Sequence, residues 1–225
     1  MSGKNYKALQ EKIGTASTDM IAAANLLKDN VKGKFDQTVE LHINLGVDPK
    51  KSEQIVRGSV SLPHGTPKKK NVVVITASAA KQKAALAAGA TKAGGEELIK
   101  EIVDQGSLDA DVVVATPDMM PKIAKAAKIL GPKGLMPNPK NGTVTPDPDK
   151  AVTELSGGKI SFKMDQTGNI HEGIGKISWD AAKVAANAQA LLQAVKAVRP
   201  GAQRGEYIKK VVLKSTMSPG IQITA

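Results

Sequence analysis

Cysteine is absent from the 225-residue sequence. Its absence excludes disulfides, thiolate metal sites and catalytic thiols, and it fits a reducing compartment such as the cytoplasm. Aromatic residues make up only 2% of the chain, with Phe35 and Tyr207 as lone exceptions in the segments of interest below. We therefore expect no platform of aromatic rings on which single-stranded nucleic acid could stack.

Long apolar runs are also missing, since none approaches the ~18 residues of a membrane-spanning helix. Met1–Lys12 lacks the apolar core and cleavage site of a signal peptide, so we expect a cytoplasmic protein without a membrane partner. The three histidines, His42, His64 and His171, show no paired spacing. A zinc-protease motif would need a second histidine after His171-Glu172, so we expect no metal site and no cofactor.

Positive charge is in excess, because 32 Lys and Arg stand against 21 Asp and Glu and give a net charge of +11. Cations beside phosphates release condensed counterions, so we expect a polyanionic partner, with nucleic acid ahead of an acidic membrane. Residues 67–158 hold 13 basic against 10 acidic residues, a net charge of +3. The two flanking segments hold 19 against 11, a net charge of +8, and so carry most of this predicted affinity.

The middle of the chain has the pattern of a parallel sheet covered by helices. Val72–Thr76 and Asp111–Pro117 contain continuous apolar runs, as expected for strands buried on both faces. Helical composition is found at Ala79–Ala88, Glu96–Asp104 and Met119–Leu130. The βαβα order predicts a Rossmann-like α/β domain.

The flanks have the pattern of an antiparallel sheet with one polar face. Apolar and polar residues alternate in Thr38–Leu45, in Lys159–Asp165 and near the C-terminus at Ile221–Ile223. Ser178–Val198 and Thr18–Lys28 have the apolar spacing of helices that cover the other face. The prediction is an α+β fold with two domains: an open antiparallel-sheet α/β sandwich built from both chain ends, and an inserted α/β domain.

Two short segments are candidates for the crossing points between these domains. Pro63–Pro67 is rich in turn-forming residues and Ser156–Gly158 is flexible, so together they would form a hinge. Two ordinary surface loops explain the same composition equally well. We place the discontinuous domain at residues 1–66 plus 159–225 and the inserted domain at residues 67–158.

Gly131–Thr143 is the most unusual stretch of the sequence. Its dense Pro and Gly fix an irregular backbone, and Lys133 and Lys140 add charge that could cradle a phosphate, although such a segment is more often a plain surface connector. It lacks the ending of a Walker loop, and no Gly-x-Gly-x-x-Gly turn follows the strand at Val72. Nucleotide hydrolysis and dinucleotide binding therefore lose their main support.

This same stretch carries a resemblance to a known family. Gly131-Pro-Lys-Gly-Leu-Met-Pro-Asn-Pro-Lys140, followed by Gly-Thr-Val-Thr145, resembles the signature of the L-one family of large-subunit ribosomal proteins. Lys34–Glu40, the stretch from Thr167 to Lys176, and Ser215–Met217 are similar to the family's bacterial members. The resemblance covers almost the whole chain.

The resemblance implies a two-domain, non-enzymatic protein whose first domain joins both chain ends. It also implies that the protein, a monomer when free, binds a stem and loops of large-subunit ribosomal RNA at the mobile stalk and helps transfer RNA leave the exit site. Bacterial members commonly repress translation of their own operon by binding its messenger RNA. The implied location is the cytoplasmic ribosome.

Carried over to this sequence, the family's RNA-binding residues fall on both flanks: Phe35, Thr38, Glu40, Lys163, His171, Ser215, Thr216 and Met217. The alternating pattern independently places Thr38, Glu40 and Lys163 on polar strand faces. Glu40 is unsuited to phosphate, but it could accept hydrogen bonds from a 2′-hydroxyl or an amino group, or orient a nearby lysine. Ser218 stands where the resemblance leads us to expect glycine, and its side chain would narrow a close approach to RNA.

Other basic residues have a weaker claim. Lys68-Lys69-Lys70 lies beside the proposed hinge, where a solvated surface is the commoner reading of a charge run. Lys209, Lys210 and Lys214 lie on a predicted strand ahead of Thr216, where phosphate contact is more plausible.

Two other functions fit parts of the sequence. An α/β enzyme acting on a phosphorylated substrate would use the carboxyl ends of Val72–Thr76 and Val112–Thr116, but no nucleophile, base or phosphate loop is identifiable. A general nucleic-acid chaperone would bind unrelated RNAs with similar affinity and an equally steep salt dependence.

Overall fold

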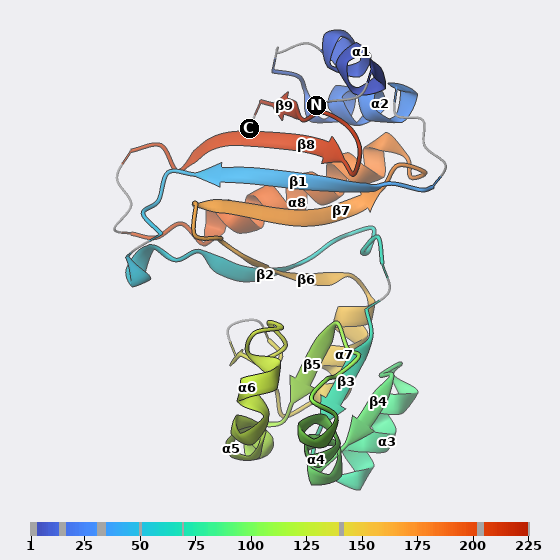
Figure 1. Cartoon of the computed structure of the whole chain (residues 1–225), viewed down its shortest axis with the longest axis vertical. Coiled ribbons are helices and arrows are strands. Elements are labelled where there is room, and N and C mark those ends of the chain that lie inside the picture. Colours follow the sequence, from blue (N-terminus) through green and yellow to red (C-terminus); the bar gives the residue numbers. More distant parts are fainter. Residues whose placement is uncertain are drawn as a thin grey trace. The chain divides into compact units, whose positions relative to one another are not determined.

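The structure is a computed structural model that describes residues 4–13, 17–30, 35–49, 51–68, 70–139, 142–201 and 205–224. Lys69 and Lys140, which the charge pattern singled out, lie outside the described residues. The chain divides into two compact units, one formed by residues 1–67 and 160–225 and the other by residues 68–159 (Figure 1). The first unit therefore brings both ends of the chain together.

An antiparallel sheet organises the first unit. In the described residues its strand order is β7-β1-β8-β9. The strands are β1 (Thr38–Leu45), β7 (Asn169–Lys176), β8 (Ile208–Ser215) and β9 (Ile221–Ile223). Strand β1 comes from the first part of the chain and its two neighbours from the last part, so strand pairing is what joins the ends.

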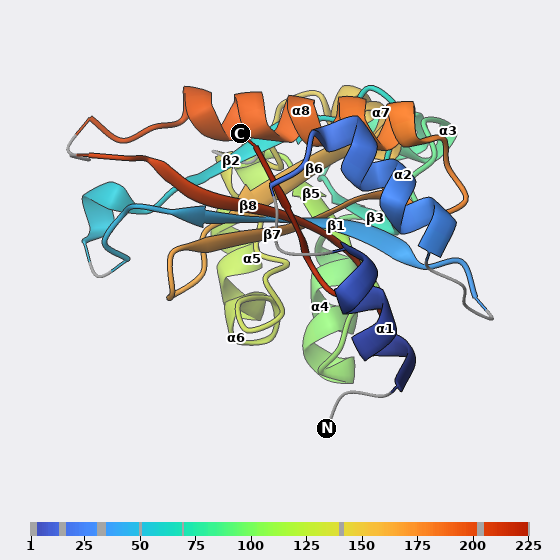
Figure 2. The same ribbon diagram turned by 90° about the horizontal axis from the view of Figure 1, so that it is seen from above.

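Two helices cover one face of this sheet, as Figure 2 shows for α8 (Ala181–Ala197) and α2 (Met20–Asn30). The alternation in β1 sends Leu41 and Ile43 into the core beneath these helices, where both are fully buried against residues such as Leu27 and Leu191. The alternate residues of β1 are only half-buried. A second helix near the N-terminus, α1 (Lys4–Ile13), was not predicted.

A smaller sheet in the first unit corrects one expectation. Strand β6 (Lys159–Lys163) pairs with β2 (Arg57–Ser61) and not with the larger sheet, next to a 3-10 turn, η1 (Ser52–Gln54). Ile160 and Phe162 still enter the same core as β1. The prediction of a single sheet was wrong because alternation fixes which side chains are buried and does not fix which strand is the neighbour.

The second unit contains a parallel sheet with helices on both faces. The strand order is β4-β3-β5, formed by β4 (Lys92–Gly94), β3 (Val72–Ile75) and β5 (Val112–Ala115). Val72 and Val74 pack on one side with α3 (Ala79–Ala87) and α7 (Pro148–Ser156). Val73 and Ile75 pack on the other with α4 (Glu96–Gln105). An antiparallel sheet and a separate parallel sheet confirm the predicted α+β fold class.

The helix predicted at 119–130 is broken into short pieces. These are η2 (Pro117–Met119), α5 (Met120–Ile123), η3 (Ala124–Ala126) and α6 (Ala127–Leu130). Pro121 lies in the first turn of α5, where a missing N–H is tolerated, and the regular ladder of helical hydrogen bonds is interrupted by the 3-10 turn at Ala124–Ala126. Ile123, Ala126 and Leu130 are nevertheless buried, which explains why the apolar pattern suggested one helix.

Helices long and apolar enough to cross a membrane were sought in the described ranges, and none occurs there.

Candidate nucleic-acid interface

The half-exposed face of the β1 sheet is lined by polar residues from three strands. Thr38, Glu40, His42 and Asn44 alternate with the core residues of β1. On β8, Lys214 lies opposite Glu40 and Lys210 lies opposite Asn44. On β7, the partners are Lys176, His171 and Asn169. Strand pairing thus gathers lysines, amides and histidines from β1, near the start of the chain, and from β7 and β8, near its end.

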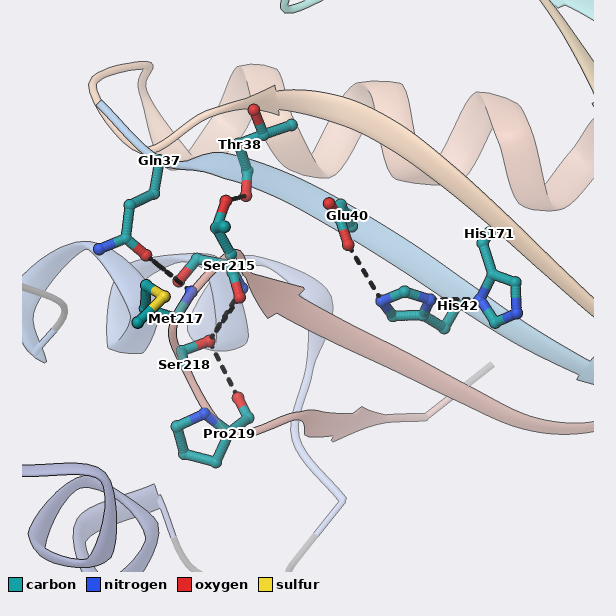
Figure 3. A network of polar contacts seen from close by, with 10 residues as sticks. Gln37, Thr38, Glu40, His42, His171, Ser215, Met217, Ser218 and Pro219 are labelled. Carbon is teal, nitrogen blue, oxygen red and sulfur yellow. Dashed lines mark hydrogen bonds and ion pairs between the residues drawn. The ribbon is translucent and has the colours of Figure 1, made fainter. Parts of the chain in front are cut away.

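A turn after β8 is fastened to the residue that precedes β1. The amide oxygen of Gln37, Oε1, accepts a hydrogen bond of 2.9 Å from Ser215 Oγ and one of 3.1 Å from the backbone N–H of Met217 (Figure 3). Thr216 N–H donates to the carbonyl oxygen of Thr38 at 3.1 Å. Gln37 and Ser215 are buried, so this clamp is shielded from water and sets where residues 216 and 217 project.

Ser215 was predicted to bind RNA, yet its side chain is fully buried. Its hydroxyl is engaged with Gln37, so in this structure Ser215 supports the turn and offers no surface of its own. By contrast, Met217 is 66% exposed and Phe35 is 56% exposed, although both are large apolar side chains. Both side chains are therefore available for contact with a partner.

Ser218 does not obstruct the surface as its replacement of glycine suggested. Its Oγ accepts a 2.8 Å hydrogen bond from Ser215 N–H and donates one of 3.0 Å to the Pro219 carbonyl oxygen. The Ser218 residue is only 4% exposed. Among the described residues only glycines have a positive φ, so the backbone at Ser218 does not require glycine. The hydroxyl is therefore turned inward, where it closes the turn.

The segment before β1 is also tied to the end of β7. The carboxylate of Asp36 accepts hydrogen bonds from the Ser178 N–H at 3.2 Å and from its hydroxyl at 2.9 Å. Lys176 Nζ donates to the Asp36 carbonyl oxygen and to Thr38 Oγ1 at 3.3 and 3.1 Å. These bonds hold the backbone next to Phe35, whose side chain remains exposed.

Two histidines that showed no relation in sequence meet on the open face. His42 and His171 are directly opposite in the β1–β7 register, and their Nδ1 atoms are 2.6 Å apart. His42 Nε2 lies 3.5 Å from a Glu40 oxygen, and His171 Nε2 lies 3.5 Å from an Asp165 oxygen. Burial and then the neighbouring His171 lower the pKa of His42, partly opposed by Glu40. Strand pairing therefore brings together two histidines that the sequence spacing did not relate.

Asp165 anchors the tight connection between β6 and β7. Its Oδ1 accepts hydrogen bonds from the N–H groups of Asn169 and Thr167 at 2.7 and 2.8 Å, and its Oδ2 accepts one from Thr167 Oγ1. These donors, the Asn169 N–H foremost, lower the pKa of Asp165 to about 2. The carboxylate beside His171 therefore stays charged throughout the neutral range.

Lys163 is exposed at the end of β6, on the smaller sheet and not on the sheet that holds Thr38. Five further predicted residues belong to the β1 sheet or to its fastened turn: Thr38, Glu40, His171, Thr216 and Met217. Within the described residues, no group of three His, Cys, Asp or Glu side chains could hold a metal ion.

Sequence reasoning missed Gln37 and His42. Gln37 lies in a quoted motif, but only its burial and its two donors reveal a structural role. His42 is a partner of His171 only because β1 and β7 pair in one register. No spacing in the sequence encodes that register, so neither role could have been found before the fold was known.

Comparison with known proteins identifies the family. Residues 27–219 match the model of the "Ribosomal protein L1p/L10e family". The chain is 53% identical to the "Large ribosomal subunit protein uL1" of Persephonella marina, over 88% of this chain and 81% of that protein. It is 46% identical to the protein of the same name from Solibacter usitatus, over 98% and 93% of the two chains. On these matches the chain belongs to the ribosomal protein L1p/L10e family.

Proposed function

We propose that this chain is a structural constituent of the large ribosomal subunit and binds large-subunit ribosomal RNA through the polar face of the β1 sheet and the adjoining turn. The observation that carries the proposal is the clamp by Gln37, which holds the exposed Thr216 and Met217 beside Thr38. A ribosomal-protein family also accounts for the chain without catalysis, so the α/β enzyme alternative is set aside.

The chemistry of this face suits folded RNA. Structured RNA is recognised through its shape, its phosphates and its 2′-hydroxyls, for which lysines, threonines and backbone groups are suitable partners. On β8, Lys214 lies opposite Glu40 and Lys210 lies opposite Asn44, so both lysines belong to the polar face. Met217 offers an adaptable apolar contact, and Phe35 offers a single ring for one base.

Each predicted residue has a part in this proposal. Thr38, Glu40, His171, Thr216, Met217 and Phe35 contact RNA directly, Lys163 supplies phosphate contact from the smaller sheet, and Ser215 holds the turn. The site lies in a first domain, residues 1–66 plus 159–225, and residues 67–158 form an inserted domain. The compact units at 1–67 with 160–225 and at 68–159 support this division.

The proposal also includes a location on the ribosome and two further roles. The RNA site lies at the mobile stalk, and the protein assists the release of transfer RNA from the exit site. It also represses translation of its own operon, because a messenger RNA that presents the same stem would meet the same polar face. These functions rest on the family and on one RNA-binding surface with two possible RNAs.

Binding to three nucleic acids tests the proposal. The protein is titrated with the stalk stem of large-subunit ribosomal RNA, a scrambled stem and duplex DNA, each at several salt concentrations. We expect Thr216→Ala and Met217→Ala each to weaken stem binding by about tenfold or more, or about 1.4 kcal/mol. Lys163→Ala should mainly reduce the salt dependence, by up to about 0.9 in the slope of log K against log salt.

Matched variants separate the site from general effects. Thr91→Ala and Leu86→Ala remove exposed side chains of the same kinds from the second unit, and they should leave stem binding unchanged. Equal affinity for all three nucleic acids, with losses only from Lys163→Ala, would instead identify a general nucleic-acid chaperone.

A further inference from the structure

A row of four titratable groups crosses the open face of the β1 sheet. In order they are Glu40, His42, His171 and Asp165, with separations of 3.5, 2.6 and 3.5 Å between neighbouring oxygen and nitrogen atoms. The planes of the two rings meet at 64° in an edge arrangement, with centroids 4.8 Å apart. Figure 3 shows the Glu40, His42 and His171 part of the row.

The short distance between the Nδ1 atoms of His42 and His171 requires one proton between them. At 2.6 Å, two Nδ1 atoms attract each other only if one carries a hydrogen and the other offers a lone pair. Two lone pairs or two N–H groups facing each other at this distance would repel. The centre of the row therefore holds a single proton, shared between the two imidazoles.

The outer nitrogens favour a proton each, because each faces a carboxylate. His42 Nε2 is a buried atom with Glu40 beside it, and His171 Nε2 lies beside Asp165. Three protons on four ring nitrogens give the pair one positive charge, since two neutral imidazoles carry only two. A fourth proton would force two N–H groups against each other at the centre.

The surroundings decide which ring changes its charge. Burial, the nearby His171 and Lys214 lower the pKa of His42, against the opposing effect of Glu40. Lys210 lies further along β8, and Glu172 follows His171 on β7 and so points to the other side of the sheet. His171 is exposed, so its Nε2 can exchange a proton with water while His42 remains neutral.

We propose that His42 and His171 act as one shared-proton cation that holds Glu40 in place as a hydrogen-bond acceptor for RNA and makes RNA binding dependent on pH. His42 is a positioning residue in this proposal, and His171 is the group that gains and loses the proton. With the proton bound, the row of four groups has a net charge of −1, and without it a net charge of −2. A polyanion is repelled more strongly by the second state, so RNA affinity falls as pH rises. The RNA part of this inference rests on the proposed function, but the proton count does not.

The free protein tests the proton count. Nitrogen-15 NMR should follow the ring nitrogens of all three histidines between pH 5 and 8. We expect His171 to take up one proton and His42 to remain a neutral ring protonated at Nε2 throughout. In His171→Gln, His42 should take up a proton at higher pH than in the unchanged protein, because the neighbouring charge is gone. Independent protonation of both rings in the unchanged protein would overturn the proposal.

RNA binding tests the consequence. Affinity for the ribosomal stem is measured at pH 5.5 and pH 8 for the unchanged protein, His171→Gln, His42→Gln and the matched control His64→Gln. We expect a loss of roughly three- to tenfold at pH 8 in the unchanged protein and in His64→Gln, the effect of one partly solvated charge. His171→Gln should lose most of this pH dependence, because it removes the group that gains and loses the proton. His42→Gln retains His171, and its amide can still donate to Glu40, so it should keep both the pH dependence and most of the affinity.

Together, the NMR and RNA-binding experiments distinguish failure of the proposed function from failure of the proposed histidine pair. A single shared proton by NMR, combined with no preference for the ribosomal stem at any pH, would sink the proposed function and leave the histidine pair intact. A preference for the stem whose pH dependence is the same in all four proteins would overturn the role of the pair in RNA binding. Loss of the fold in His42→Gln is detected by NMR, and His171→Gln, at an exposed position, then carries the test.

Discussion

The two units of this protein use their sheets in opposite ways. In the first unit, β1 buries every second residue and leaves the alternate residues half-exposed. In the second, all four residues of β3 are buried, because helices cover both faces of the sheet. A sheet covered on one face can present side chains from several strands to a macromolecule, whereas a sheet covered on both faces can offer only its edges and loops.

Charge follows the same division. Most of the excess positive charge lies in the segments that flank residues 67–158, as the sequence showed. In the first unit, strand pairing collects part of this charge opposite β1, at Lys210 and Lys214. Under the proposed function, the first unit uses one face of its sheet for recognition, while the sheet of the second unit is buried in its core.

The largest effect should come from emptying either core with the same substitution. Ile43 lies on an inner strand of its sheet and Ile75 on the central strand of its sheet, and both are fully buried. We expect Ile43→Ala and Ile75→Ala each to cost about 2–5 kcal/mol in the free energy of unfolding, since each leaves a cavity. Hydrogen exchange read along the chain should show lost protection mainly in residues 1–67 and 160–225 for the first variant, and in residues 68–159 for the second.

Both outcomes of that pair are informative. Separate losses would support two domains that unfold independently, with the boundaries proposed above. If both variants instead lowered protection equally over the whole chain, the units would form one cooperative structure, and the comparison between them would describe geometry only.

A smaller effect is expected from removing a buried amide that supports the recognition face. Gln37→Ala leaves Ser215 Oγ and Met217 N–H without their acceptor, which should cost about 1–3 kcal/mol of stability. Stem affinity should also fall, since the turn that holds Met217 is released. The matched variant is Gln82→Ala in the second unit, which removes a 2.8 Å bond to the Thr76 carbonyl oxygen.

Chemical denaturation and the stem-binding assay check this pair. Gln82→Ala should lower stability without changing stem affinity beyond experimental error. Equal affinity in Gln37→Ala and the unchanged protein would show that the position of the turn does not matter for RNA, which contradicts the proposed site.

Sequence patterns predicted the type of each sheet because burial on one or two faces leaves a direct trace. Thr38–Leu45 alternates and Val72–Thr76 does not, and the structure follows both patterns. The prediction of one helix at 119–130 was wrong because an apolar repeat reports which residues are buried and does not distinguish α-helical turns from 3-10 turns. Strands with weaker patterns, such as β2 and β4, were not anticipated.

The candidate site was less predictable than the fold. Resemblance to a family supplied its residues, and alternation placed Thr38 and Glu40 on the polar face. Burial of Ser215, the inward turn of Ser218 and the pairing of His42 with His171 all depend on contacts between segments far apart in sequence. Such contacts follow from strand register, which local patterns do not determine.

The smallest effect expected is a matched pH dependence of stability in the two units. The pKa of Asp165 is lowered to about 2, chiefly by the Asn169 N–H, and the pKa of Asp111 in the second unit is also lowered, chiefly by the Asn71 N–H. A folded-state pKa below the unfolded value means that the unfolded chain binds more protons in the acid range. The stabilisation by each carboxylate is therefore present above the unfolded pKa and is lost as pH falls.

For Asp165, the window of this loss runs from the ordinary value of 3.8 down to about 2. Unfolding free energies of the unchanged protein, Asp165→Asn and Asp111→Asn should be compared at pH 7 and at pH 2.5. The advantage of the unchanged protein over Asp165→Asn should shrink at the lower pH, because at pH 2.5 this carboxyl group is protonated in the unfolded chain, which favours unfolding. An advantage that is constant with pH would mean that Asp165 stabilises its turn through the geometry of its hydrogen bonds and not through its charge. The charge of Asp165 would then act only on His171.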